Sequence, residues 1–110
     1  MSEMQLNELT EEQINFHLIL HSGNARSKVI QSLREYREGR AAEAERFLEL
    51  AEEDLKNAHD IHFKMIQKEA EGKKTEFSLL LMHAEDHLMS TLTMKELVKE
   101  MIEIFKSRNL

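Results

Sequence analysis

Residues 78–94 decide the fold and read Ser-Leu-Leu-Leu-Met-His-Ala-Glu-Asp-His-Leu-Met-Ser-Thr-Leu-Thr-Met. Four ionisable residues interrupt an apolar run, which then resumes without a glycine or proline to break it. The pattern therefore predicts a helix that is apolar over more than one face. On this helix His83 and His87 lie one turn apart on the same face, with Asp86 beside it. Burying a carboxylate next to an apolar seam is costly unless it is paired, protonated or bound to a metal ion.

The composition favours helices in the rest of the chain as well. The 110 residues include no proline, no tryptophan and three glycines, and good helix formers such as Leu, Glu, Ala and Lys dominate. A chain of this length is expected to form one domain. The sequence therefore predicts a single all-α domain over residues 1–110, in which the polar segment 1–9 is loose.

Two glycines divide the chain into three predicted helices, at 11–38, 40–71 and 76–107. Gly39 and Gly72 each suit the left-handed position that follows a helix. Thr10 and Gln13 have the spacing of a capping box at the first helix start, and Thr75 is the expected N-cap of the third helix. Because the connections are short, the helices are expected to form an antiparallel up-down-up bundle.

Apolar residues recur at helical spacing and predict the core. In the first helix these are Ile14, Leu18, His21, Ala25, Val29, Leu33 and Tyr36. In the second they are Ala44, Phe47, Leu48, Ala51, Leu55, Ala58, Ile61, His62, Met65 and Ile66. One apolar stripe per helix would suffice for such a bundle, but residues 77–92 are apolar over a wider arc. This excess predicts a homo-oligomer packed through the third helix, of a stoichiometry that periodicity does not give.

Charge and residue content exclude several classes of protein. The formal net charge of −6 argues against a general nucleic-acid binder. The absence of cysteine excludes thiol catalysis, disulfides and cysteine metal sites. The longest uncharged apolar run, 77–82, is too short to cross a bilayer, and the first residues lack the features of a signal peptide. The expectation is a cytoplasmic protein without direct membrane insertion.

The spacing of the ionisable residues in 83–87 leaves several chemistries open. His83 and His87 could chelate a metal ion, be satisfied by hydrogen bonds at an interface, or provide a nucleophilic imidazole. Asp86 could be a solvated carboxylate at a helix edge. Alternatively, copies of Asp86 could converge on a symmetry axis, where a hard cation or shared protons would offset their repulsion.

Other polar residues allow similar pairs of interpretations. His17 and His21 lie four residues apart and His59 and His62 three apart, and all four are expected at the edge of the core. The small polar insertion 21–27 could line a phosphate site, with charge from Arg26 and hydrogen bonds from Ser22 or Asn24. It could equally serve small-residue helix packing, in which Gly23 marks a close contact or a bend.

Three blocks carry a resemblance to a known family. They are His-Ser-Gly-Asn-Ala-Arg at 21–26, Ile-Gln-Lys-Glu-Ala-Glu-Gly at 66–72 and, most specifically, His-Ala-Glu-Asp-His-Leu-Met at 83–89. Over residues 13–106 the chain resembles the enzyme IIA component of the lactose/cellobiose family of the bacterial phosphoenolpyruvate-dependent sugar phosphotransferase system (PTS).

The resemblance implies a phosphotransferase component that assembles as a homotrimer of three-helix subunits. His83 would accept a phosphoryl group from the phosphohistidine of HPr and pass it to a cysteine of enzyme IIB, for the uptake of β-linked di- or oligosaccharides. His87 would support the site. Asp86 from each subunit would gather around a divalent cation, usually Mg²⁺, at the trimer axis. With Asp86 pointing to that axis, His83 could face outward toward the partner proteins.

Two positions depart from the family pattern. Glu85 stands where many relatives have glutamine, and His62 replaces the glutamine of an Ala-His-x-x-Gln motif, so the roles of both are open. Two rival hypotheses also remain. One is a non-catalytic helical oligomer that binds a metal ion through its histidines and Asp86, and the other is a scaffold whose ionisable groups only set helix register.

Overall fold

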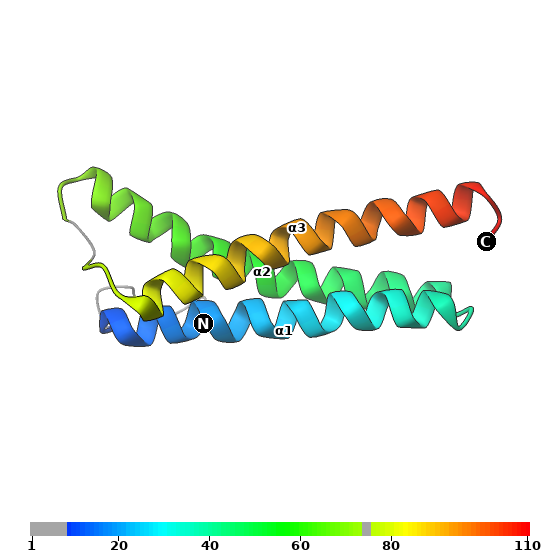
Figure 1. Ribbon diagram of the computed structural model, residues 1–110, viewed down its shortest axis with the longest axis horizontal. Coiled ribbons are helices and arrows are strands. Elements are labelled where there is room, and N and C mark those ends of the chain that lie inside the picture. Colours follow the sequence, from blue (N-terminus) through cyan, green and yellow to red (C-terminus); the bar gives the residue numbers. More distant parts are fainter. Residues whose placement is uncertain (1–8, 74–75) are drawn as a thin grey trace.

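A computed structural model describes residues 9–73 and 76–110, which form three helices and, within those ranges, no strand (Figure 1). Helix α1 spans Glu11–Arg37, α2 spans Ala41–Ala70 and α3 spans Leu79–Ser107. α1 and α3 begin at the same end of the molecule and α2 at the other (Figure 1). The predicted all-α, up-down-up bundle is therefore confirmed.

Most helix ends lie within one residue of the prediction, for the expected reasons. The backbone N–H of Thr10 donates to Gln13 Oε1 at 3.0 Å, and the backbone N–H of Gln13 donates to Thr10 Oγ1 at 3.1 Å. This is the predicted capping box. Gly39 and Gly72 follow the C-caps of α1 and α2 with φ of 82° and 90°, a region that favours glycine.

The predicted start of the third helix was wrong. α3 begins at Leu79 rather than residue 76, because Ser78 is the N-cap and its Oγ accepts a hydrogen bond from the backbone N–H of Leu81 at 3.0 Å. Serine satisfies an orphan N–H of the first turn as well as threonine does. Thr75, the expected cap, lies outside the described residues.

The core consists of apolar side chains from all three helices. They are Ile14, Leu18, Ala25, Val29, Ala44, Leu48, Ala51, Leu55, Ala58, Met65, Ala84, Leu88, Val98 and Ile102. Ile66, which was assigned to this core, is 51% exposed and does not belong to it. Residues 1–8 of the segment predicted to be loose are outside the described ranges, but Leu9 packs against the core.

A buried hydrogen bond joins α1 to the start of α2: Ser32 Oγ donates to the Ala44 carbonyl at 2.6 Å.

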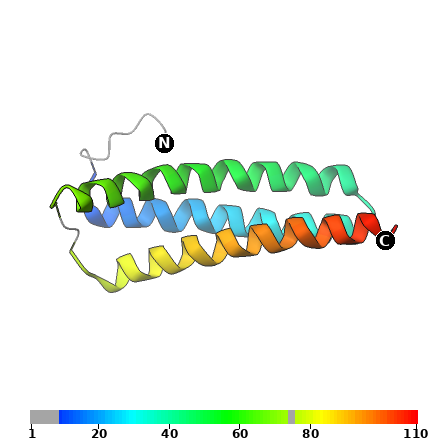
Figure 2. The same ribbon diagram turned by 90° about the horizontal axis from the view of Figure 1, so that it is seen from above.

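The three helices do not contact one another equally. α2 and α3 flank α1 and pack more extensively against α1 than against each other (Figure 2). Polar pairs join α2 to α3 at three levels: Glu45 with Lys106 at 3.4 Å, Glu52 with Lys99 at 3.1 Å, and His62 with Glu85 at 2.7 Å. In residues 9–73 and 76–110, no helix combines the length and apolar character that a membrane span requires.

Candidate phosphoryl-transfer site

α3 presents His83 and His87 about one turn apart on neighbouring positions of one face, and Asp86 on another side. Ala84 and Leu88 are buried and fix the side that faces the core. At about 100° per residue, Asp86 then points away from the core, and His87 lies on the side that packs against α1. His83 lies between these two directions and is exposed. The His83 and His87 rings are 5.3 Å apart between centroids and meet edge to face at 87°.

Gly23 makes room for His87. A Cβ atom built on Gly23 would lie 3.9 Å from His87 Cε1, so the His87 ring packs directly against this part of α1. α1 continues as helix through Gly23. Of the two roles predicted for this glycine, the structure therefore supports close helix packing, and the contact with His87 was not foreseen from the sequence.

The environment of His87 disfavours its charged form. Burial lowers the pKa of His87 below the ordinary 6.5, the nearby Arg26 and His83 lower it further, and Asp86 opposes these effects. Its Nδ1 is buried and has no hydrogen-bond partner among the described residues. Near pH 7, His87 is thus a neutral imidazole held against α1, whereas the neighbouring His83 is exposed.

Asp86 lies on an exposed apolar face of α3, between Met82 and Met89, and we call this face the outer face. Its other large side chains are Leu79, Met82, Met89, Leu97, Met101 and Ile104, each at least 41% exposed. Within residues 9–73 and 76–110, Asp86 has no ion-pair partner. Its carboxylate oxygens are the hard donors that Mg²⁺ prefers. The described part of one chain, however, contains no group of three or more potential metal ligands.

The remaining histidines lie elsewhere. His17 and His21 stack at 6.2 Å on α1, and burial lowers the pKa of His21. His59 is exposed rather than at the core edge and stacks on Phe63 at 6.4 Å. None of these three joins the His83–His87 pair.

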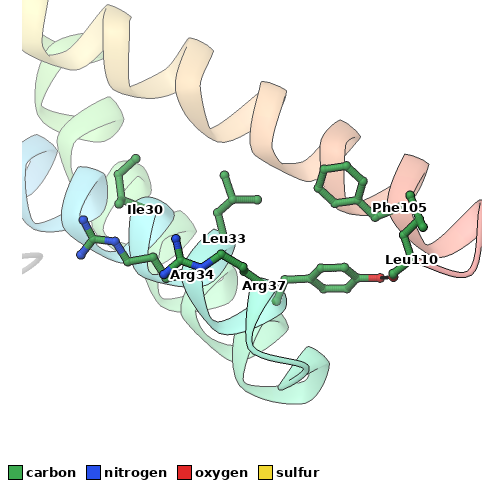
Figure 3. Close-up of a pocket in the computed structure, with 7 residues that line it drawn as sticks. Ile30, Leu33, Arg34, Arg37, Phe105 and Leu110 are labelled. Atoms are coloured by element: carbon green, nitrogen blue, oxygen red, sulfur yellow. Dashed lines mark hydrogen bonds between the residues drawn. The ribbon is translucent and has the colours of Figure 1, made fainter.

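An apolar cavity also lies away from the histidines. It has a volume of about 560 Å³ and is lined by Ile30, Leu33, Arg34, Tyr36, Arg37, Phe105 and Leu110. Phe105 and Leu110 face the α1 residues across it (Figure 3). Phe105 is 22 residues beyond His83 on the same helix, about 33 Å along its axis. The cavity therefore contributes nothing to chemistry at His83.

Comparison with known proteins identifies the family. A family model described as the lactose/cellobiose-specific IIA subunit of the PTS matches residues 13–106. The chain belongs to this family. The match extends over all three helices and includes each of the blocks that carried the resemblance.

Individual relatives agree with this assignment of the IIA subunit. This chain is 66% identical to the oligo-beta-mannoside-specific EIIA component of the PTS from Bacillus subtilis strain 168, over 110 residues that cover 100% of each protein. The crystal structure of the cellobiose-specific enzyme IIA from Bacillus anthracis matches with a TM-score of 0.85 at 45% identity, covering 92% of this chain and 94% of that one. The Escherichia coli IIA(chitobiose), solved in complex with HPr, matches with a TM-score of 0.75 at 31% identity, over 97% and 99%.

His62 and Glu85, the two residues whose roles the sequence left open, contact each other. His62 Nε2 lies 2.7 Å from the Glu85 carboxylate and joins α2 to α3. Glu85 therefore points toward α2, whereas His87 points toward α1. The sequence had shown both substitutions but not their pairing. The pairing depends on how α2 packs against α3, which helical periodicity alone does not give.

Proposed function

We propose that this IIA subunit is a phosphocarrier that accepts a phosphoryl group from HPr on His83 and passes it to a cysteine of enzyme IIB. The observation that carries the proposal is the contrast within the His83–His87 pair. His83 is exposed, while His87 is packed against Gly23. Family membership supports the reaction class, and the relative solved with HPr supports the donor.

The chemistry requires only a nucleophile that a partner can reach. One ring nitrogen of neutral His83 attacks the phosphorus of the donor phosphohistidine. A new P–N bond forms at His83 as the donor's P–N bond breaks, and the donor imidazole leaves with its electron pair. In the second step, the cysteine thiolate of IIB attacks the same phosphorus and His83 leaves. Positioning and charge supply most of the catalysis in such transfers.

The neighbouring side chains have supporting roles. His87 stays neutral because of its burial, so it can hydrogen-bond next to His83 without requiring a counter-charge. Asp86 projects from the outer face, so its carboxylate points away from α1 and from His87. This arrangement reduces the repulsion between Asp86 and a phosphoryl group on His83, since repulsion between charges falls with distance.

The outer face of α3 supports a homotrimer. An exposed apolar surface of this length, with Asp86 within it, is costly to leave in water and suits packing around a symmetry axis. Three Asp86 carboxylates at that axis would hold a divalent cation such as Mg²⁺, which neutralises their repulsion. Sedimentation equilibrium should show trimers for the wild type and weaker assembly after chelation of divalent ions. Assembly that is unchanged both by chelation and in Asp86→Leu would refute the axial ion.

The oligo-beta-mannoside-specific relative supports β-linked oligosaccharides as the transported sugars. The proposed place of action is the cytoplasm.

A reconstituted relay tests the carrier function. Phosphoenolpyruvate, enzyme I and HPr are mixed with the IIB domain of the same system, with and without this chain, and phosphoryl on IIB is measured. We expect IIB to be labelled only when the wild-type chain is present, and not with His83→Ala. The rival metal-binding oligomer predicts no labelling with either chain, and instead loss of bound metal in His83→Ala.

A further inference from the structure

Arg26 is a half-buried cation on the side of α1 that faces α3. It follows Gly23 by three residues, so the two lie on neighbouring positions of one helix face. Because Gly23 packs against His87, Arg26 also lies beside this part of α3. Helical side chains incline toward the N-terminus. α1 and α3 run parallel (Figure 1), so this inclination directs Arg26 toward the level of His87 and then of His83.

The charge of Arg26 has no protein counter-ion in the described part of the chain. Within residues 9–73 and 76–110, no carboxylate lies within ion-pair distance of its guanidinium. Lys28, two residues later and on the side that faces α2, pairs with Asp54. A partly buried cation without an anion is costly. The environment of Arg26 thus favours an anion that arrives from outside the chain.

The field of Arg26 reaches the histidine pair, since its charge contributes to the lowered pKa of His87. The other polar residues of the 21–27 insertion are placed differently. Ser22 is fully buried, and Asn24 is exposed on the opposite side of α1, because two residues turn the helix by about 200°. Of the three residues considered for a phosphate site, only Arg26 faces α3 beside the histidines.

We propose that Arg26 is a positioning residue that holds the phosphoryl group carried by His83. The inference rests on the proposed phosphocarrier function. A phosphorylated His83 places a multiply charged anion next to His87, and Arg26 is the cation on the helix against which His87 packs. The guanidinium fork matches phosphoryl oxygens, and such charge-assisted hydrogen bonds are stronger than neutral ones. Arg26 therefore stabilises the phosphorylated state relative to the free one.

The test measures the equilibrium of phosphoryl transfer between HPr and this chain. Wild type, Arg26→Gln, Arg26→Lys and the control Arg34→Gln are each mixed with phospho-HPr, and the phosphorylated fractions are read by intact mass. Arg34 is an exposed cation on the same helix, away from the histidines. We expect Arg26→Gln to reduce the transfer equilibrium constant about tenfold. Arg26→Lys should fall between it and the wild type, and Arg34→Gln should match the wild type.

The outcomes separate this inference from the proposed function. If the wild type is phosphorylated on His83 and Arg26→Gln has the same equilibrium constant, the Arg26 inference is overturned while the carrier function stands. If the wild type is not phosphorylated at all, both fail. Thermal melting identifies loss of fold in Arg26→Gln. In that case Arg26→Met, which retains an apolar stem, replaces it, and the same tenfold loss is required of it.

Discussion

Gly23→Ala probes the contact that positions His87. The added methyl group would lie 3.9 Å from His87 Cε1, an ordinary van der Waals distance. The position is inside α1 and does not have a positive φ. Alanine is better than glycine in a helix interior by about 0.8–1 kcal/mol. Because no steric cost opposes this gain, we expect the free energy of unfolding to rise by about 1 kcal/mol.

The expected gain is measurable. For a chain of this size, about 1 kcal/mol corresponds to a rise in melting temperature of roughly 4 °C. Urea titration followed by circular dichroism gives the free energy of unfolding, and transfer from phospho-HPr reports on the site. Since His87 need not move, the transfer rate of Gly23→Ala should stay within about twofold of the wild type.

Two further substitutions serve as comparisons for Gly23→Ala. Gly39→Ala meets no atom within 4 Å but has φ of +82°, so the same chemical change there should destabilise the protein by about 1 kcal/mol. Gly23→Leu needs space that His87 occupies and should slow the transfer to His83. A loss of stability in Gly23→Ala would refute the reasoning, because it would mean that His87 does not tolerate even a methyl group.

Three more predictions follow from other contacts. In a double-mutant cycle measured by urea unfolding, His62→Gln and Glu85→Gln should show a coupling free energy of about 0.5–1 kcal/mol. The value is small because the Glu85 side chain is partly exposed. Additive effects of the two substitutions would contradict a direct bond. Ser32→Ala removes the buried hydrogen bond to the Ala44 carbonyl and should cost about 1 kcal/mol, whereas exposed Ser27→Ala should change the urea midpoint little. The folded-state pKa values of His21 and His87 lie below 6.5. As the pH falls through 6.5, the unfolded chain therefore binds more protons than the folded chain does. The free energy of unfolding should decrease from about pH 7.5 toward the lowered pKa values and then level off. A urea midpoint that rises over this acid range would show that these histidines are not buried as neutral groups.

The fold was predictable because local signals in this chain agree with one another. The capping box at Thr10 and the glycines at 39 and 72 mark helix ends by their own chemistry, without help from distant residues. The start of α3 was missed because Ser78 and Thr75 are both good caps. Ile66 was misplaced because the apolar pattern of α2 is wider than the side that its neighbours cover within one chain.

The site was predictable only in part. The spacing of His83, Asp86 and His87 on one helix gave their relative directions, since that depends only on helix geometry. Contacts between helices depend on how the helices pack. The bond from His62 to Glu85 and the packing of His87 on Gly23 could therefore not be derived from periodicity.

The most direct test of the central claim is intact mass spectrometry after incubation with phosphoenolpyruvate, enzyme I and HPr. The wild type and His59→Ala, which removes another exposed histidine, should each gain one acid-labile phosphoryl group. His83→Ala should gain none. A phosphoryl group on His83→Ala would place the chemistry on a different residue and contradict the account.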